Sequence, residues 1–323
     1  MTLSNTSESE QFAESVLEGL SAEPKWLSSR YFYDDEGSRL FMEIMKLPEY
    51  YLTRSELEIF TDNAAAIQRA FADGKGTFDL IELGAGDGTK TAVLIEELLK
   101  HSPDMRYSAI DISQEACDAL SEKFCSKFPS LGIEMLAGDY FTMLDSLSGT
   151  NRRKIILFLG SNIGNFRRDA SIEFFRSLRD VMEPDDMLFI GFDLQKDPRV
   201  IVRAYDDANG VTADFNLNLL ARINRELGGH FNIKDFSHYA VYRPIEGAAR
   251  SFLMSRKKQS VRIDAFEKSF EFEAWEPVFM EISQKYNEAM IADLAAESGF
   301  EIADTFYDSR RYYCNSLWRP AAK

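Results

Sequence analysis

The sequence predicts an α/β protein with a Rossmann-type, doubly wound main domain and a second, inserted α+β domain. Three observations support this prediction: short apolar segments alternate with helical segments from residue 78 to residue 192, a glycine-rich turn follows the first of them, and the alternation stops near Lys196. Parallel strands need crossover helices, so a repeated strand–helix order indicates a parallel sheet with helices on both faces.

Composition and charge limit the class of protein. The chain has 323 residues, 45% hydrophobic and 28% charged, which is enough for an ordinary core in one or two domains. Its formal net charge of −16 repels phosphate backbones, so we expect no nucleic-acid partner. The three cysteines and three histidines lack metal-ligand spacing, so we expect no metal site.

The start of the sequence is polar and acidic, unlike a signal peptide, and no apolar run reaches transmembrane length. We therefore expect a cytoplasmic protein that acts on a small molecule and has no membrane partner. The sequence leaves the oligomeric state open and is compatible with a monomer.

Periodicity predicts the individual elements. Apolar residues at three- and four-residue steps predict helices at 38–45 and 55–71, separated by Pro48. In the alternating region we predict strands at residues 78–83, 107–112, 132–136, 154–159 and 186–192, and helices at 89–100, 114–128 and 170–182.

Beyond the alternating region the pattern changes to helices followed by strands that alternate as in an antiparallel sheet. We predict helices at 200–206, 212–227 and 286–299, and strands at 240–243, 249–254, 261–263, 269–274, 300–307 and 312–319. The simplest arrangement assigns residues 61–195 and 287–323 to a cofactor-binding Rossmann-type domain. Residues 11–60 and 196–286 then form a substrate-binding domain, and the first ten residues are expected to be frayed.

The glycine-rich turn reads Glu-Leu-Gly-Ala-Gly-Asp-Gly at residues 82–88, between a strand and a helix. Glycines there permit positive φ and close approach of a ligand to the backbone, as in dinucleotide-binding enzymes. Asp111, at the end of the second strand, is placed to accept hydrogen bonds from ribose hydroxyls. A helix N-cap is the alternative role for Asp111, and Ser113 competes for it.

Two acidic features favour S-adenosylmethionine over a dinucleotide. Glu82 at the end of the first strand resembles the acidic residue of methyltransferases, and Gly138-Asp139-Tyr140 resembles the acidic–aromatic pair that flanks their adenine. The sulfonium of this cofactor is an activated leaving group, so the protein has mainly to position a nucleophile and exclude water.

A second turn, Leu-Gly-Ser-Asn-Ile-Gly-Asn-Phe at residues 159–166, follows the fourth strand. Ligands of open parallel sheets bind beyond the carboxyl ends of the strands. Gly160 and Gly164 would keep the backbone low there, and Asn165 would project a carboxamide toward a substrate. An ordinary turn residue remains the alternative for Asn165.

Several segments together resemble one family, the histidine Nα-methyltransferases of ergothioneine biosynthesis. The most specific are Pro-Glu-Tyr-Tyr-Leu-Thr-Arg at 48–54 and Ala-Tyr-Asp-Asp-Ala-Asn-Gly-Val-Thr-Ala-Asp-Phe-Asn at 204–216. Residues 30–38, 160–166 and 281–286 add to the resemblance, which runs from about residue 30 to the C-terminus.

The resemblance implies an S-adenosylmethionine-dependent enzyme that trimethylates the α-amine of L-histidine to the betaine hercynine. It implies cofactor contacts at Tyr33, Gly84, Lys90, Asp111, Asp139 and Tyr140. It implies that the catalytic residues around the amino-acid head group are Tyr50, Asn165 and Tyr205. It places Glu281 and Ser283 at the side-chain end of the substrate, with Phe41 and Thr212 nearby.

These residue types suit histidine. Phenol and carboxamide donors hold a carboxylate without adding a fixed charge beside the sulfonium. An imidazole donates an N–H to a carboxylate and accepts from a hydroxyl, which Glu281 and Ser283 provide. Because they are two residues apart, both would face one side of a strand.

Two departures from the family pattern concern the side-chain end of the substrate. Arg250 and Ser251 stand where the family has a Glu-Met pair whose methionine lines the imidazole site, unless a shifted register places Met254 there. Asn162 replaces a threonine. These departures leave open that the same chemistry acts on another amino acid or amino-acid-derived amine.

Two alternatives come from other classes, a non-catalytic cofactor-binding protein and a nicotinamide-dependent oxidoreductase. The expected ligands are all present, which disfavours the first. The Gly138-Asp139-Tyr140 segment disfavours the second.

Overall fold

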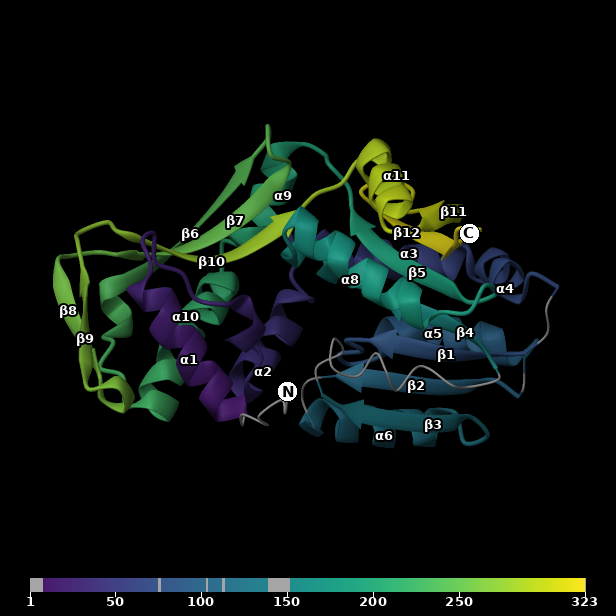
Figure 1. Cartoon of the computed structure of the whole chain (residues 1–323), viewed down its shortest axis with the longest axis horizontal. Coiled ribbons are helices and arrows are strands. Elements are labelled where there is room, and N and C mark those ends of the chain that lie inside the picture. The colour runs from purple at the N-terminus through teal and green to yellow at the C-terminus, as the bar shows by residue number, and fades with distance from the viewer. Residues whose placement is uncertain (1–7, 75–76, 103, 112–113, 139–151, 323) are drawn as a thin grey trace. The chain divides into compact units, whose positions relative to one another are not determined.

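The computed structural model describes residues 8–74, 77–102, 104–111, 114–138 and 152–322 (Figure 1). The chain splits into two units. Unit 1 comprises Met1–Tyr50 and Asp197–Ser283, and unit 2 comprises Tyr51–Lys196 and Gln284–Lys323. The domain boundary expected at residue 60 lies within helix α3 (Tyr51–Asp62), which belongs to unit 2.

Unit 2 contains a seven-stranded sheet in the order β11-β12-β5-β4-β1-β2-β3. Its strands are β1 (Phe78–Leu83), β2 (Arg106–Asp111), β3 (Gly132–Ala137), β4 (Arg153–Phe158), β5 (Met187–Asp193), β11 (Phe300–Tyr307) and β12 (Tyr313–Pro320). The first five are parallel, whereas β12 is antiparallel to both β5 and β11. The predicted α/β sheet is confirmed, with an antiparallel hairpin closing one edge.

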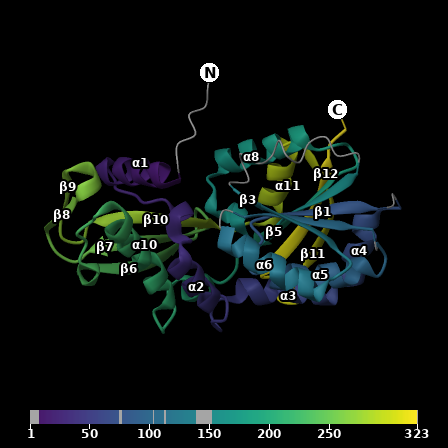
Figure 2. The ribbon, with the colours of Figure 1, turned by 90° about the horizontal axis from the view of Figure 1, so that it is seen from below.

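Helices cover both faces of this sheet (Figure 2). One face carries α3, α4 (Ala64–Ala72), α5 (Thr89–Leu99) and α6 (Gln114–Lys127), and the other carries α8 (Arg168–Val181) and α11 (Glu288–Glu297). The single helix predicted at 55–71 is wrong, because α3 and α4 are separate and Asn63 lies between them outside helical geometry. No proline or glycine marks this break in the sequence.

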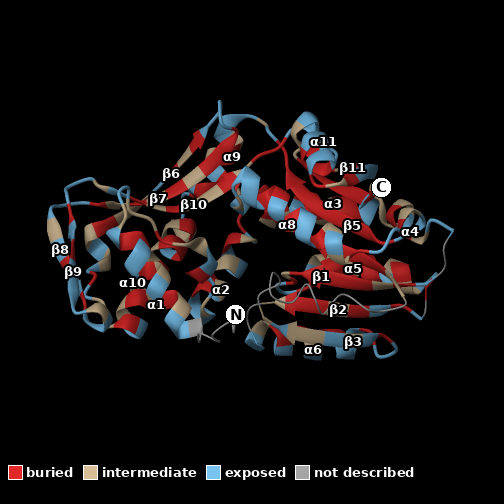
Figure 3. Cartoon of the chain, viewed as in Figure 1, coloured by how far each residue is buried: buried red, intermediate tan, exposed pale blue. Residues whose placement is uncertain are grey.

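Burial follows position in the sheet (Figure 3). Every residue of β5 is buried, while each residue of the edge strand β3 keeps some exposure. Central parallel strands are covered on both faces and therefore read as continuous apolar runs, which made them easy to predict.

Unit 1 combines an N-terminal helical segment with a three-stranded sheet, β10-β7-β6, and a two-stranded sheet, β8-β9. Phe12, Phe32, Phe215, Leu253 and Met280 share its core, so the N-terminal segment and residues 197–283 bury their apolar faces together. The elements are α1 (Glu8–Ser21), α2 (Asp35–Ile44), α9 (Pro198–Tyr205), α10 (Val211–Leu227), β6 (Phe236–Arg243), β7 (Ala248–Ser255), β8 (Gln259–Ile263), β9 (Lys268–Phe272) and β10 (Pro277–Gln284).

Two details of unit 1 differ from the sequence prediction. Helix α1 already begins at Glu8, inside the segment expected to be frayed. Strand β10, which begins at Pro277, was not among the predicted strands, although it carries Glu281 and Ser283, for which a strand was assumed. Within the described ranges, no helix has the length and apolar character needed to cross a membrane.

Candidate active site

The glycine turn after β1 is shaped for a ligand at its middle position. Gly84, Gly86 and Gly88 have φ values of 74°, 55° and 63°. A Cβ at Gly88 would lie 2.3 Å from the Leu120 side chain, so this glycine serves packing between α5 and α6. A Cβ at Gly86 would meet nothing within 4 Å, which leaves space above the turn.

Asp111 lies beside this open space. The Gly86 N–H donates to the Asp111 carboxylate at 3.2 Å, so the ends of β1 and β2 present backbone and carboxylate together. This arrangement suits the ribose-binding role expected for Asp111. Ser113, the competing helix cap, and the predicted adenine neighbours Asp139 and Tyr140 lie outside the described residues.

The buried Glu82 carboxylate supports the glycine turn from the protein interior and is bonded to protein groups. It is 2% exposed and accepts hydrogen bonds from Thr91 at 2.7 Å and Tyr107 at 2.6 Å. Burial raises the pKa of Glu82 to about 7, and the two hydrogen bonds oppose this rise only in part. Glu82 therefore ties the start of α5 to β1 and β2.

Lys90, expected at the cofactor, forms an ion pair with Glu56 of α3. The Glu56 side chain is fully buried and also accepts from the Gly160 N–H at 3.0 Å, the Tyr313 hydroxyl at 3.1 Å and the Asn315 amide at 2.9 Å. Three segments of unit 2 thus converge on one carboxylate, which sequence reasoning missed because its partners are far apart along the chain.

The turn after β4 lies against the turn after β1. A Cβ at Gly160 would lie 3.6 Å from the Lys90 ammonium, and a Cβ at Gly84 would lie 3.3 Å from the Asn162 amide nitrogen. Asn162, one of the departures from the family pattern, therefore lies beside the glycine turn after β1. Asn165 ends the short 3-10 helix Asn162–Asn165 and is exposed.

In unit 1 the predicted residues Tyr33, Phe41 and Tyr50 come together in an aromatic cluster. The ring centroids are 5.5 Å apart for Tyr33 and Phe41 and 6.2 Å apart for Phe41 and Tyr50, both in edge-on geometry. Phe215, which sequence reasoning missed, packs against Tyr33 and Phe41. Tyr33 keeps 36% of its surface exposed, so its ring remains accessible.

Tyr205 and Ser283 also meet within unit 1. The Tyr205 hydroxyl donates to the Ser283 hydroxyl at 2.8 Å in a buried position. His238, which sequence reasoning missed, lies 2.9 Å from the Tyr205 carbonyl through its Nε2 and therefore donates an N–H there. Burial lowers the pKa of His238, which keeps its ring neutral, although the carbonyl contact opposes this.

Thr212 lies at the start of α10, where Asp207 caps the helix. The Asp207 carboxylate accepts from the Thr212 N–H at 2.8 Å and the Val211 N–H at 3.1 Å. Burial opposes ionisation of Asp207, but these backbone donors hold its pKa below the ordinary value. Thr212 is buried, so the Asp-Asp-x-x-Gly-Val-Thr motif first of all builds a helix end.

The pairing of strands β6 and β7 shows where Arg250, Ser251 and Met254 lie. Arg250 forms an ion pair with Glu246 at 2.6 Å, and the same carboxylate pairs with Arg243 at 2.9 Å. Ser251 is buried opposite Ala240. Since the β6–β7 pairing is regular, Met254 faces the other side of the strand and does not take the place of Ser251.

Glu281 and Ser283 both lie on β10, half-buried and buried respectively. The alternation of buried positions shifts by one residue between Met280 and Ser283, so a simple two-residue period does not describe this strand.

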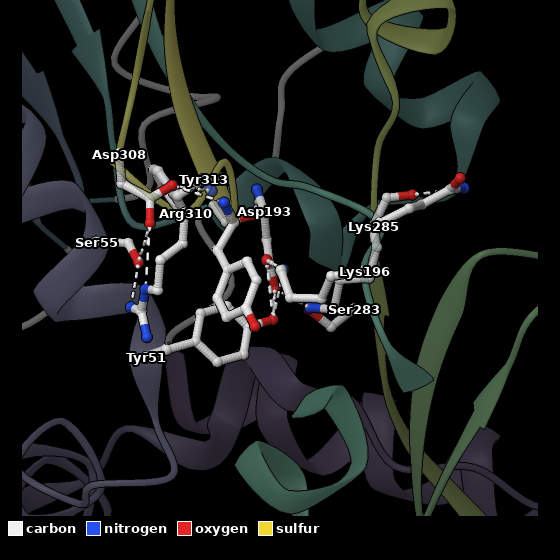
Figure 4. Close-up of polar contacts among 12 residues, drawn as sticks. Tyr51, Ser55, Asp193, Lys196, Ser283, Lys285, Asp308, Arg310 and Tyr313 are labelled. Atoms are coloured by element: carbon white, nitrogen blue, oxygen red, sulfur yellow. Dashed lines mark hydrogen bonds and ion pairs between the residues drawn. The ribbon is translucent and has the colours of Figure 1, made fainter. Parts of the chain in front are cut away.

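A buried charge cluster at the end of β5 was not anticipated from the sequence (Figure 4). Asp193 accepts hydrogen bonds from the Tyr51 hydroxyl at 2.9 Å and pairs with Lys285 at 2.8 Å and with Lys196. Burial alone would raise the pKa of Asp193, but the two ammonium groups outweigh it and hold the pKa low. The Asp193 N–H also donates to Ser161, which joins the cluster to the turn after β4.

The seven-stranded sheet, the glycine turns after β1 and β4 and the Asp111 carboxylate at the end of β2 are typical of a Rossmann-type, S-adenosylmethionine-dependent methyltransferase. The chain belongs to the family described as histidine-specific methyltransferase, SAM-dependent, whose model matches residues 12–320.

Two relatives are named histidine N-alpha-methyltransferase. The protein of Mycolicibacterium smegmatis is 37% identical over 91% of this chain and 90% of its own length. That of Mycobacterium tuberculosis is 38% identical over 87% of this chain and 86% of its own length. Ergothioneine biosynthesis protein 1 of Schizosaccharomyces pombe is 29% identical over 87% of this chain and 37% of its own length.

The raised pKa of Glu82 predicts a pH-dependent stability. Because the folded state holds the proton more tightly, the contribution of Glu82 is fully present below 4.5 and is lost as the pH rises through about 7. We expect this loss to be on the order of 3 kcal/mol. Urea unfolding of the wild type and Glu82→Gln across this range measures it: the variant should lack this fall, and identical pH profiles would contradict the prediction.

The ion pair of Lys90 with Glu56 predicts coupled effects on cofactor affinity. Glu56→Gln leaves the ammonium uncompensated and free to move, so the dissociation constant of S-adenosylhomocysteine should rise about tenfold. In a Lys90→Met background the same Glu56→Gln change should raise the dissociation constant less, because only the contacts of Glu56 with Gly160, Tyr313 and Asn315 are then altered. Calorimetric titration of the four proteins measures the coupling, and additive effects would show that the two residues act separately.

Proposed function

We propose that the protein transfers methyl groups to the α-amine of free L-histidine, three times in succession, and releases the betaine hercynine. The observation that carries this proposal is the buried hydrogen bond between Tyr205 and Ser283. It joins a residue expected at the amino-acid head group to one expected at the imidazole. Family membership over residues 12–320 supports the same substrate.

In this proposal Gly84, Lys90 and Asp111 of unit 2 hold the cofactor, and Tyr33 is assigned to it by resemblance. Asp139 and Tyr140 are assigned to the adenine by resemblance alone. The open space above Gly86 and the adjacent Asp111 carboxylate fit a ribose-bearing cofactor. The cofactor supplies an electrophilic methyl group on a sulfonium.

The amino-acid residues divide by function. Tyr50, Tyr205 and Asn165 are assigned to the carboxylate and amine. Tyr50 and Asn165 can act there as neutral donors that add no fixed charge beside the sulfonium, whereas the Tyr205 hydroxyl already donates to Ser283 and can accept from the amine. Glu281 accepts from the imidazole N–H and Ser283 donates to the other ring nitrogen. Phe41 and Thr212 are assigned to the walls of this region, and Phe41 already packs edge-on against Tyr50.

The chemistry consists of three successive displacements. A neutral amine attacks the methyl carbon, the carbon–sulfur bond breaks, and S-adenosylhomocysteine leaves. One proton must leave the nitrogen before each attack, and water beside the tyrosine hydroxyls can take it. After the third transfer the nitrogen has no lone pair, so the reaction stops at the trimethylated product.

The second candidate is the same chemistry on another amino acid or amino-acid-derived amine. It rests on Ser251, which is smaller than the methionine usual in the family at this position. Because Arg250 already pairs with Glu246, it gives no support for an acidic substrate.

Incubation with S-adenosylmethionine and each of the twenty amino acids, followed by mass spectrometry, separates the two candidates. We expect up to three methyl additions on histidine before any on another amino acid. Absence of any mass gain on histidine would rule out the main proposal, and a different labelled amino acid would establish the second.

Glu281 should control side-chain specificity, whereas Asn165 should not. Losing one charge-assisted hydrogen bond costs roughly 1.5–3 kcal/mol, so Glu281→Ala should lower kcat/KM for histidine about 10- to 150-fold. Tryptophan should lose less or gain, because the site becomes more apolar. Asn165→Ala, as the control, should impair both substrates alike. Equal losses for both substrates in Glu281→Ala would show that Glu281 does not read the side chain.

A further inference from the structure

The chain passes between its two units at three places, Tyr50/Tyr51, Lys196/Asp197 and Ser283/Gln284. At each crossing, a residue of unit 2 within two positions of the boundary contacts the Asp193 carboxylate. These residues are Tyr51, Lys196 and Lys285 (Figure 4). A single side chain therefore holds every point at which the chain enters or leaves the sheet unit.

The cluster is dry and tightly bonded. Asp193 and Lys285 have fully buried side chains, and the Lys196 side chain is 4% exposed. Lys196 also donates to the Tyr51 hydroxyl at 2.8 Å and lies over the Tyr51 ring, 4.2 Å from its centroid. Removing Asp193 takes away the carboxylate that two buried ammonium groups share, so the three anchors depend on this one side chain.

The anchored segments carry residues of the proposed amino-acid site. Tyr50 directly precedes Tyr51. Ser283 lies on β10 and precedes Lys285 by two residues. Tyr205 ends helix α9, which begins at Pro198, two residues after Lys196. Because few residues separate them from their anchors, displacement of an anchor is expected to displace Tyr50 and Ser283 directly and Tyr205 through the short helix α9.

We propose that Asp193 is a positioning residue for the amino-acid substrate: it fixes the three crossings and, through them, the segments that carry Tyr50, Tyr205 and Ser283. This inference rests on the proposed function for the identity of the site. Asp193 itself is buried among its partners and touches no reacting atom. Its loss should weaken amino-acid binding and leave the cofactor residues of unit 2 in place.

A second buried pair in the same unit provides a matched control. Lys154 and Asp186 form an ion pair at 2.9 Å, and both side chains are 1% exposed. Asp186 directly precedes β5, whereas Asp193 ends it, so the two carboxylates lie at opposite ends of one strand. Loss of either carboxylate charge should destabilise unit 2. The partner of Asp186, however, is Lys154, which is not beside any of the three crossings.

The experiment compares Asp193→Asn with Asp186→Asn for melting temperature, the KM of histidine and the dissociation constant of S-adenosylhomocysteine. We expect both variants to melt earlier. Asp193→Asn should raise the KM of histidine about tenfold or more and weaken cofactor binding several-fold less, because Tyr33 is the one proposed cofactor residue that lies in unit 1. Asp186→Asn should leave both within about twofold. Equal KM values in the two variants, or a parallel loss of cofactor affinity in Asp193→Asn, would overturn the proposal.

Tyr51→Phe decides the question if Asp193→Asn does not fold, since it removes only one hydroxyl from the cluster. A rise in histidine KM at unchanged cofactor affinity supports the proposal, and an unchanged KM overturns it. Wild-type turnover on the amino-acid panel is measured first. If the wild type methylates another amino acid, KM is taken for that substrate, so failure of the proposed function is distinguished from failure of this inference.

Discussion

The structure depends most on the fully buried carboxylate of Asp193 at the end of β5. One buried carboxylate here serves two lysines, and the Tyr51 hydroxyl links the groups by donating to Asp193 and accepting from Lys196. Burial, together with the nearby Lys285 ammonium, lowers the pKa of Lys196 to about 8. A polar cluster at this position provides directional contacts that an apolar core would lack.

A second buried carboxylate, Glu56, also connects several segments of unit 2, near the turns after β1 and β4. It gathers Lys90, the turn at Gly160 and two residues of β12, so the ends of β1 and β4 are held in register with the C-terminal strand. Gly191 makes this possible, because a Cβ there would lie 2.4 Å from Glu56 and 2.2 Å from the Tyr313 hydroxyl. Both networks connect residues that are distant in sequence.

The separation of these partners along the chain explains which features could be predicted from the sequence and which could not. The strands and the glycine turn were predictable because periodicity and positive-φ glycines are local signals. The partnership of Tyr51 with Asp193 spans 142 positions and leaves no such signal. Tyr51 and Lys285 lie inside the motifs that identified the family, yet their neighbours received the functional roles. The cofactor and substrate roles assigned from the resemblance all remain predictions, and Asp139 and Tyr140 lie outside the described residues.

The antiparallel strand β12 has a consequence for synthesis. It lies between β5 and β11 in the sheet, although it comes from the far end of the sequence, and it supplies Tyr313 and Asn315 to Glu56. Until these residues leave the ribosome, β5 is an unprotected edge with its hydrogen-bonding groups exposed. The cofactor turn can therefore be fully braced only after translation of β12, so a nascent chain that stalls earlier carries an open, aggregation-prone sheet.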